Sequence, residues 1–204
     1  MPASLDVDAA GADATKASAP AEFLAMIEGL RSVQLRAELE LSELPAPQRL
    51  APWSHAVAAT VHAPDTDDEI GSGRLVVLHD PEGVESWNGT MRFVVFATCD
   101  IDGEIARDPL LPEVAWSWLT DALDESGAEY TALGGTVTAT SSVRFGDISG
   151  SDRNDDVEIR ASWTALEGSS ARHLAAFAGL LAVAAGLPPE GVSTISPVRP
   201  VLRP

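Results

Sequence analysis

Arginine side chains on predicted strands are the residues in this sequence best suited to binding chemistry. Arg36, Arg144 and Arg160 fall on the polar sides of alternating segments, in a chain with 13 basic and 31 acidic residues. A guanidinium donates hydrogen bonds in a planar fork that matches carboxylates and phosphates. These three residues therefore form a candidate ligand-binding set on an open sheet face, with Arg74 and Arg92 as further candidates. The alternative is that they pair with glutamates on neighbouring strands.

Three tryptophans are candidates for a protein interface. Trp53 and Trp87 fall in predicted loops, and Trp116 lies off the apolar side of a predicted helix. Exposed tryptophans are enriched where proteins bind one another. The alternative is that the three rings cover the edge of the core, and the sequence leaves both interpretations open.

The sequence contains no recognisable pattern for nucleophilic catalysis or nucleotide binding. Cys99 ends an apolar segment, which predicts a buried and unreactive thiol. The chain has no Gly-x-Ser-x-Gly turn, and its glycine pairs lack the spacing of phosphate-binding loops. We therefore assign no catalytic residue and predict no cofactor, and whether the protein is an enzyme stays open.

Metal binding is also not predicted. The segment Asp100-Ile-Asp-Gly-Glu104 resembles half of a calcium loop, but Leu111 stands where the twelfth-position acid would be. A turn explains this segment better. The four histidines form no zinc-protease pattern. The single cysteine excludes a cysteine-based zinc site and an intramolecular disulfide.

The net charge of −18 restricts the classes of partner. Duplex nucleic acids and anionic membrane surfaces both require a basic footprint, so neither is predicted as a partner. The N-terminus lacks a signal pattern, and the longest apolar run is shorter than the ~20 residues of a spanning helix. These features predict a cytoplasmic protein whose partner is another protein or a second copy of the chain.

Hydrophobic periodicity predicts three helices and six strands. The helices are expected from Pro20 to Leu30, from Pro112 to Gly127 and from Ser169 or Ser170 to Gly186. The strands are expected at 33–41, 55–62, 74–79, 91–99, 136–145 and 157–164. The order αββββαββα predicts an α+β fold, with a largely antiparallel sheet packed by three helices. A single domain is expected at 20–187, between a disordered tail at 1–19 and a proline-rich extended tail at 188–204.

Four segments resemble a known family. They are Arg49–Ser54, Trp87–Phe96, Asp108–Trp116 and Arg144–Asp147, and they are similar to an actinobacterial family known as domain of unknown function 3000. The resemblance implies a cytoplasmic bacterial protein and carries over no activity or catalytic residue. The element order is also similar to the secretion-chaperone-like fold of small acidic dimeric chaperones, although that fold has three strands where four are predicted here.

Two functions remain in view. The favoured one is a non-enzymatic, chaperone-like or adaptor-like module that binds another protein. The alternative is an enzyme or small-molecule binder whose anionic ligand meets Arg36, Arg144 and Arg160. A concave pocket joining these arginines would favour the alternative, and exposed tryptophans would favour the first.

Overall fold

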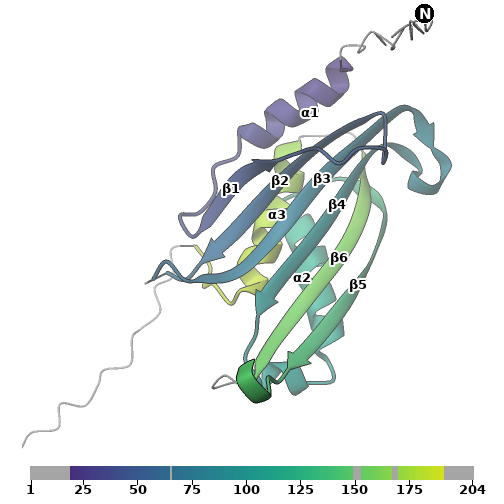
Figure 1. The fold of residues 1–204 in the computed structure, drawn as a ribbon. Helices are drawn as coiled ribbons and strands as arrows, with labels where there is room; N and C mark the ends of the chain where they lie inside the picture. The colour runs from purple at the N-terminus through teal and green to yellow at the C-terminus, as the bar shows by residue number, and fades with distance from the viewer. Residues whose placement is uncertain (1–18, 65, 149–152, 167–169, 191–204) are drawn as a thin grey trace, which may run out of the picture.

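The computed structural model describes residues 19–64, 66–148, 153–166 and 170–190 of the 204-residue chain. Its helices are α1 (Ala21–Arg31), α2 (Leu111–Glu125) and α3 (Ser170–Ala184). Its strands are β1 (Leu39–Leu44), β2 (Trp53–His62), β3 (Glu69–Val84), β4 (Gly89–Asp100), β5 (Tyr130–Ser142) and β6 (Asn154–Ala165) (Figure 1). The α+β class and the order αββββαββα are confirmed. The two predicted tails lie almost wholly outside the described residues.

The six strands form one antiparallel sheet in the order β1-β2-β3-β4-β6-β5. Neighbouring strands along the chain pair as antiparallel hairpins from β1 to β4. The chain then forms α2 and returns as β5 at the far edge, and β6 fills the position between β4 and β5. The sheet edges are therefore β1 and β5.

The helices cover one face of the sheet and leave the other open (Figure 1). Alternate strand residues such as Val77, Phe93 and Trp163 are fully buried beneath them. The α3 helix packs on the central strands and α2 packs on β5 and β6. A Cβ atom on Gly73 would lie 2.9 Å from the Phe177 ring, so this position allows α3 to approach β3 closely.

The start of β1 differs from the sequence prediction. Residues 33–41 were predicted as a strand from their alternation, but β1 begins only at Leu39, after a turn in which the Leu39 amide donates to the Arg36 carbonyl at 3.1 Å. Val33 and Leu35 are half-buried against the core beside α3. An extended segment alternates its side chains whether or not it pairs in a sheet. The alternation at residues 33–38 therefore reflects apolar side chains packed against the core, and not hydrogen bonding to another strand.

The bounds of β5 also differ, since it runs from residue 130 to 142 rather than from 136 to 145. Its pairing with β6 shifts register between Thr131 and Gly134, so a bulge lies directly before the Gly134–Gly135 pair. Ala132 adopts a φ of 50° inside this bulge. Sequence alternation begins only after such an irregularity, so the strand was predicted to start too late.

The two glycines that follow this bulge offer a matched pair of stability variants. A Cβ atom on Gly135 would lie 2.3 Å from the Arg160 carbonyl oxygen, whereas one on Gly134 would meet nothing within 4 Å. We expect Gly135→Ala to lower the free energy of unfolding by about 2 kcal/mol, because the strand backbone must move. Gly134→Ala should change it little. Urea unfolding of both variants tests this, and equal effects would contradict the close packing of β5 on β6.

Candidate functional site

The open face of the sheet carries a patch rich in arginine. Since Phe93 and Val95 point into the helix-covered core, Arg92, Val94 and Phe96 point to the opposite face. Three neighbouring rows of cross-strand partners extend from these β4 residues. We call these positions the arginine face; its members are Ser42, Leu44, Ser54, Ala56, Ala58, Arg74, Val76, Leu78, Arg92, Val94, Phe96, Gly134, Thr136, Arg160, Ser162 and Thr164. They include three arginines and no acidic residue.

The centre of the arginine face is apolar and only half-buried. Val76 and Val94 lie side by side on β3 and β4, and Phe96 follows in the next row between Arg74 and Arg160. The Arg160 guanidinium lies over the Phe96 ring, 5.5 Å from its centre, in a cation–π contact. Beside it is an open depression of about 300 Å³, where Gly134 leaves space that a side chain would fill. The surface thus combines apolar contact area with cationic groups.

Arg92 spans the neighbouring strands from its place on β4. Its guanidinium donates to the hydroxyls of Ser162 at 2.7 Å and Thr164 at 3.0 Å, and to the carbonyl of Ala132 in the β5 bulge at 2.9 Å. All three acceptors are neutral, and burial lowers the pKa of Arg92. The residue therefore fixes the bulge while its positive charge lacks a carboxylate partner in the part of the chain that the structure describes.

The other two arginines differ in their ion pairs. Arg160 pairs with Glu158 on its own strand at 2.8 Å, and its side chain stays largely exposed. Arg74 is exposed on β3 and forms no ion pair with any carboxylate of the described segments. The arginine face therefore keeps a net positive charge, although the chain as a whole is strongly acidic.

The β1–β2 loop limits the accessible part of this face. Ser54 points to the open side, and its hydroxyl donates to the Pro47 carbonyl at 2.6 Å, so the loop lies over this end of the sheet. Ala56 and Leu78 are accordingly buried. The accessible part therefore centres on Phe96 and its two flanking arginines.

The structure does not bring together the three arginines predicted from the sequence. Arg36 lies in the turn before β1, where it pairs with Glu38 at 3.0 Å and donates to the Pro188 carbonyl at 3.0 Å. Arg144 is exposed beyond the end of β5. Strands β1 and β6 are four positions apart, so Arg36 and Arg160 are separated by roughly 19 Å across the sheet. Arg74 is instead the neighbour of Arg160 on the open face.

The three candidate interface tryptophans are all half-buried. Trp53 begins β2 and Trp116 lies on α2, and both pack against the core. Trp87 ends a short 3-10 helix after β3, and its carbonyl accepts a hydrogen bond from the Thr164 hydroxyl. These positions are typical of rings at the edge of a core, and a role in an interface stays a prediction.

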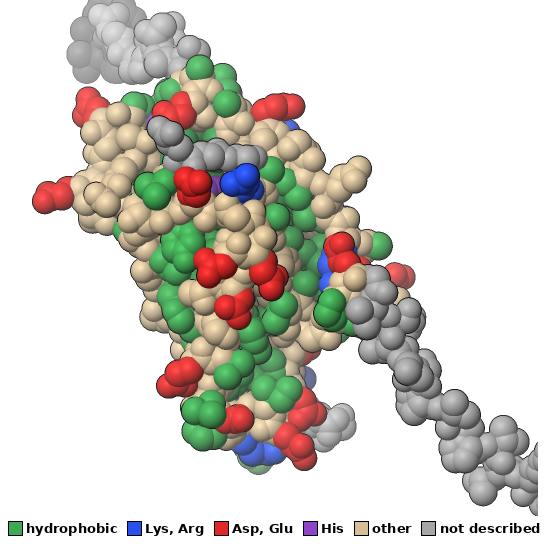
Figure 2. All heavy atoms as spheres, turned by 180° about the vertical axis from the view of Figure 1, so that it is seen from behind, with side chains coloured by type: hydrophobic (Ala, Val, Ile, Leu, Met, Phe, Trp, Pro, Cys, Tyr) green, Lys and Arg blue, Asp and Glu red, His purple; other side chains and the backbone are tan. Residues whose placement is uncertain are grey.

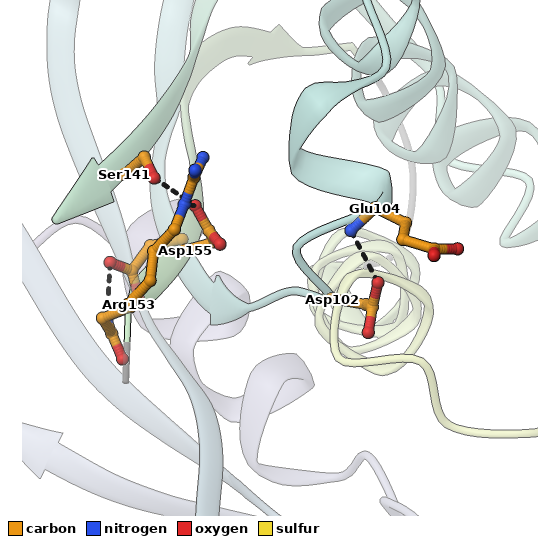
Figure 3. A network of polar contacts seen from close by, with 7 residues as sticks. Asp102, Glu104, Ser141, Arg153 and Asp155 are labelled. Atoms are coloured by element: carbon orange, nitrogen blue, oxygen red, sulfur yellow. Dashed lines mark hydrogen bonds and ion pairs between the residues drawn. The ribbon is translucent and has the colours of Figure 1, made fainter. Parts of the chain in front are cut away.

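Acidic residues gather at the end of the sheet where β5 stops and β6 begins (Figure 3). Hydrogen bonds from Ser141 and Arg153 hold the pKa of the Asp155 carboxyl below its usual value. Asp102 accepts a hydrogen bond from the Glu104 amide at 2.7 Å, which confirms the predicted turn, and the Glu104 carboxylate points away from Asp155. Within the described ranges, no three His, Cys, Asp or Glu side chains are placed to hold a metal ion. These contacts join the strand ends.

Two groups outside the arginine face were also candidates for chemistry. Cys99 is buried, as predicted, and burial raises its pKa to about 12, so the thiol is not ionised near neutral pH. Asp100 lies opposite Asp156 on β6, and burial together with this neighbour raises the pKa of Asp100. Neither arrangement supplies a nucleophile with a partner base.

The helix side of the molecule differs in charge from the arginine face, although the next row of strand residues on the open side carries Glu40 and Glu158. Figure 2 shows many more acidic than basic side chains there, with hydrophobic groups between them. Exposed acids on α2 include Glu113, Asp121, Asp124 and Glu125. No helix in the described residues has the length and apolarity that a membrane crossing requires. The contrast makes the arginine face the best candidate for the functional surface.

Comparison with known proteins places the chain in a family. The model of a family described as "Protein of unknown function (DUF3000)" matches residues 19–193, so the chain belongs to this family. Searches of curated proteins and of solved structures returned no match. The description of the family names no activity, and the similarity to secretion chaperones stays a prediction from element order.

Proposed function

We propose that this protein is a non-enzymatic binding module whose arginine face receives a segment of a partner protein carrying acidic and large apolar side chains. One observation carries this proposal. Three arginines surround half-buried Val76, Val94 and Phe96, with no acidic residue among them, in a chain of net charge −18.

Charge supports an acidic partner segment. The long-range field of the chain repels acidic peptides, so such a segment is attracted only where positive charge is local and unpaired. Arg74 and Arg92 meet this condition, because neither forms an ion pair with a described carboxylate. Charge complementarity of this kind steers encounter and selects partners.

The shape of the surface supports a peptide rather than a small molecule. Small-molecule sites are concave and bury most of the ligand. The depression beside Phe96 is open, and the sheet around it would contact a ligand from one side only. An extended peptide makes many such one-sided contacts along its length, and one apolar side chain of it fills the depression beside Arg160.

Selection from a display library of random peptides tests the proposal. We expect the immobilised protein to enrich peptides that combine Asp or Glu with large apolar residues. The double variant Arg74→Glu/Arg160→Glu should bind a synthetic selected peptide at least about tenfold more weakly, which corresponds to about 1.4 kcal/mol. Added salt should weaken binding to the wild type.

The matched control changes the same charge on the helix side. Arg31 and Arg172 are both exposed on helices, so Arg31→Glu/Arg172→Glu alters the net charge equally without touching the arginine face. This control should retain peptide binding. Selected peptides without acidic residues, or equal binding by the two double variants, would overturn the proposal.

A further inference from the structure

Strand β5 forms one edge of the sheet and pairs only with β6 (Figure 1). From Gly134 to Ser142 this pairing has no register shift. The alternate backbone groups that point away from β6 therefore form a regular row along the outer edge, with no strand partner among the described residues. An exposed edge of this kind is a template for pairing with another strand.

The opposite edge of the sheet is protected against such pairing. Strand β1 has only six residues and carries exposed Glu40 and Glu43. Arg31 of α1 forms an ion pair with Glu43 at 2.7 Å beside this edge. Short length and charged side chains are the usual means by which proteins prevent edge pairing. Strand β5 uses neither means, although both edges belong to the same sheet.

The composition of β5 favours pairing with another strand. Residues 131–143 contain no charged side chain, in a chain with 31 acidic residues. Thr136, Thr138 and Thr140 are exposed on its open side. Threonine favours strands, and threonines paired across strands stabilise a sheet. Two strongly acidic molecules repel each other, so an acid-free strip is the surface at which they can meet.

The two ends of β5 make it complementary to itself. Glu129 precedes the strand and Arg144 follows it, and both are exposed. A second copy placed antiparallel brings the Glu129 end of one strand to the Arg144 end of the other, whereas a parallel copy brings like charges together. Phe145, which is 78% exposed, then lies near the partly buried Tyr130 and Leu133 of the other copy.

From these observations we propose that the protein forms a symmetric dimer in which β5 pairs antiparallel with β5 of a second copy. The two sheets then become one continuous sheet. The helix layers of both copies lie on one side and the open faces on the other. This inference goes beyond binding at the arginine face and does not rest on it.

Sedimentation of the purified full chain tests the dimer. We expect the wild type to sediment as a dimer at about 100 µM and to dissociate on dilution. Thr138→Lys/Thr140→Lys adds two positive charges to each β5, so four lie close together along the joined strands and repel one another, and the dissociation constant should rise at least about tenfold. Ser42→Lys adds one such charge to the exposed open side of the other edge strand, β1, and should leave the dissociation constant of the dimer unchanged.

Cysteine crosslinking tests the orientation of the strands. In a symmetric antiparallel pair, one residue near the centre of β5 lies opposite its own copy, at a Cα separation that suits a disulfide. Among single cysteine variants at positions 136–140, we expect one to oxidise to a linked dimer in high yield, while Ser42→Cys stays monomeric. Circular dichroism verifies that each variant is folded.

Several results would overturn this inference. The wild type could sediment as a monomer at about 100 µM. The dimer could be unaffected by Thr138→Lys/Thr140→Lys. Ser42→Cys could crosslink as well as the cysteine variants within β5. Peptide binding is not measured in these experiments. A failure here therefore leaves the proposal for the arginine face intact.

Discussion

Replacing Trp163 with alanine is expected to lower the free energy of unfolding by about 4 kcal/mol, because it leaves a large cavity in the core. The Trp163 side chain on β6 is fully buried, and its ring stacks on Phe93 at a centroid distance of 5.9 Å. Its indole nitrogen donates to Nδ1 of His173 on α3 at 3.1 Å. The substitution therefore removes packing and also leaves a buried imidazole nitrogen without a donor.

Trp163→Phe separates these two effects. It retains an aromatic ring against Phe93 but removes the hydrogen bond to His173, so we expect a smaller cost of about 1–2 kcal/mol. Urea unfolding followed by circular dichroism measures both variants. A cost below about 1 kcal/mol for Trp163→Ala would contradict a closely packed layer between the sheet and α3.

Local patterns were sufficient to predict the class of the fold. Alternation at 157–164 identified β6 and placed Arg160 on the polar side, because side chains in a strand alternate between two faces wherever the strand lies. The periodicity and Pro112 identified α2. These signals act within one element, so they were readable without knowledge of the tertiary structure.

The composition of the candidate site depends on contacts between elements, and here the sequence was insufficient. Arg74 and Arg92 join Arg160 because β3, β4 and β6 are neighbours, and strand order is not encoded in local periodicity. Arg36 alternated with apolar residues like a strand residue, but those residues pack beside α3. Arg144 was assigned to a strand that ends two residues before it.

The two proposed surfaces have a joint consequence. In an antiparallel pair of β5 strands, residues directly opposite each other point to the same face, so both open faces lie on one side of the dimer. Two arginine faces would then be presented together. A partner with two acidic segments would bind more tightly than one with a single segment, because the second contact becomes intramolecular.

Acid is expected to destabilise the protein through His173, well before most carboxylates are protonated. Burial lowers the pKa of His173 from 6.5 to about 4. Its Nδ1 accepts a hydrogen bond from Trp163, so the neutral ring fits the core and the protonated ring does not. The neutral form stabilises the fold fully above pH 6.5, and this stabilisation is lost as the pH falls toward 4.

Comparison with His173→Gln isolates this effect. From about pH 7.5 to about pH 5 the wild type should lose about 2 kcal/mol of unfolding free energy through His173, since the unfolded chain binds a proton that the folded chain does not. Glutamine offers an acceptor to Trp163 but does not titrate. The unfolding free energy of His173→Gln should therefore fall by about 2 kcal/mol less than that of the wild type over this pH range. His55, whose pKa burial also lowers, is present in both proteins and cancels in the comparison. Equal pH dependence in urea unfolding would show that His173 takes up its proton at the same pH in the folded and unfolded chains. The buried contact with Trp163 would then have to be rejected.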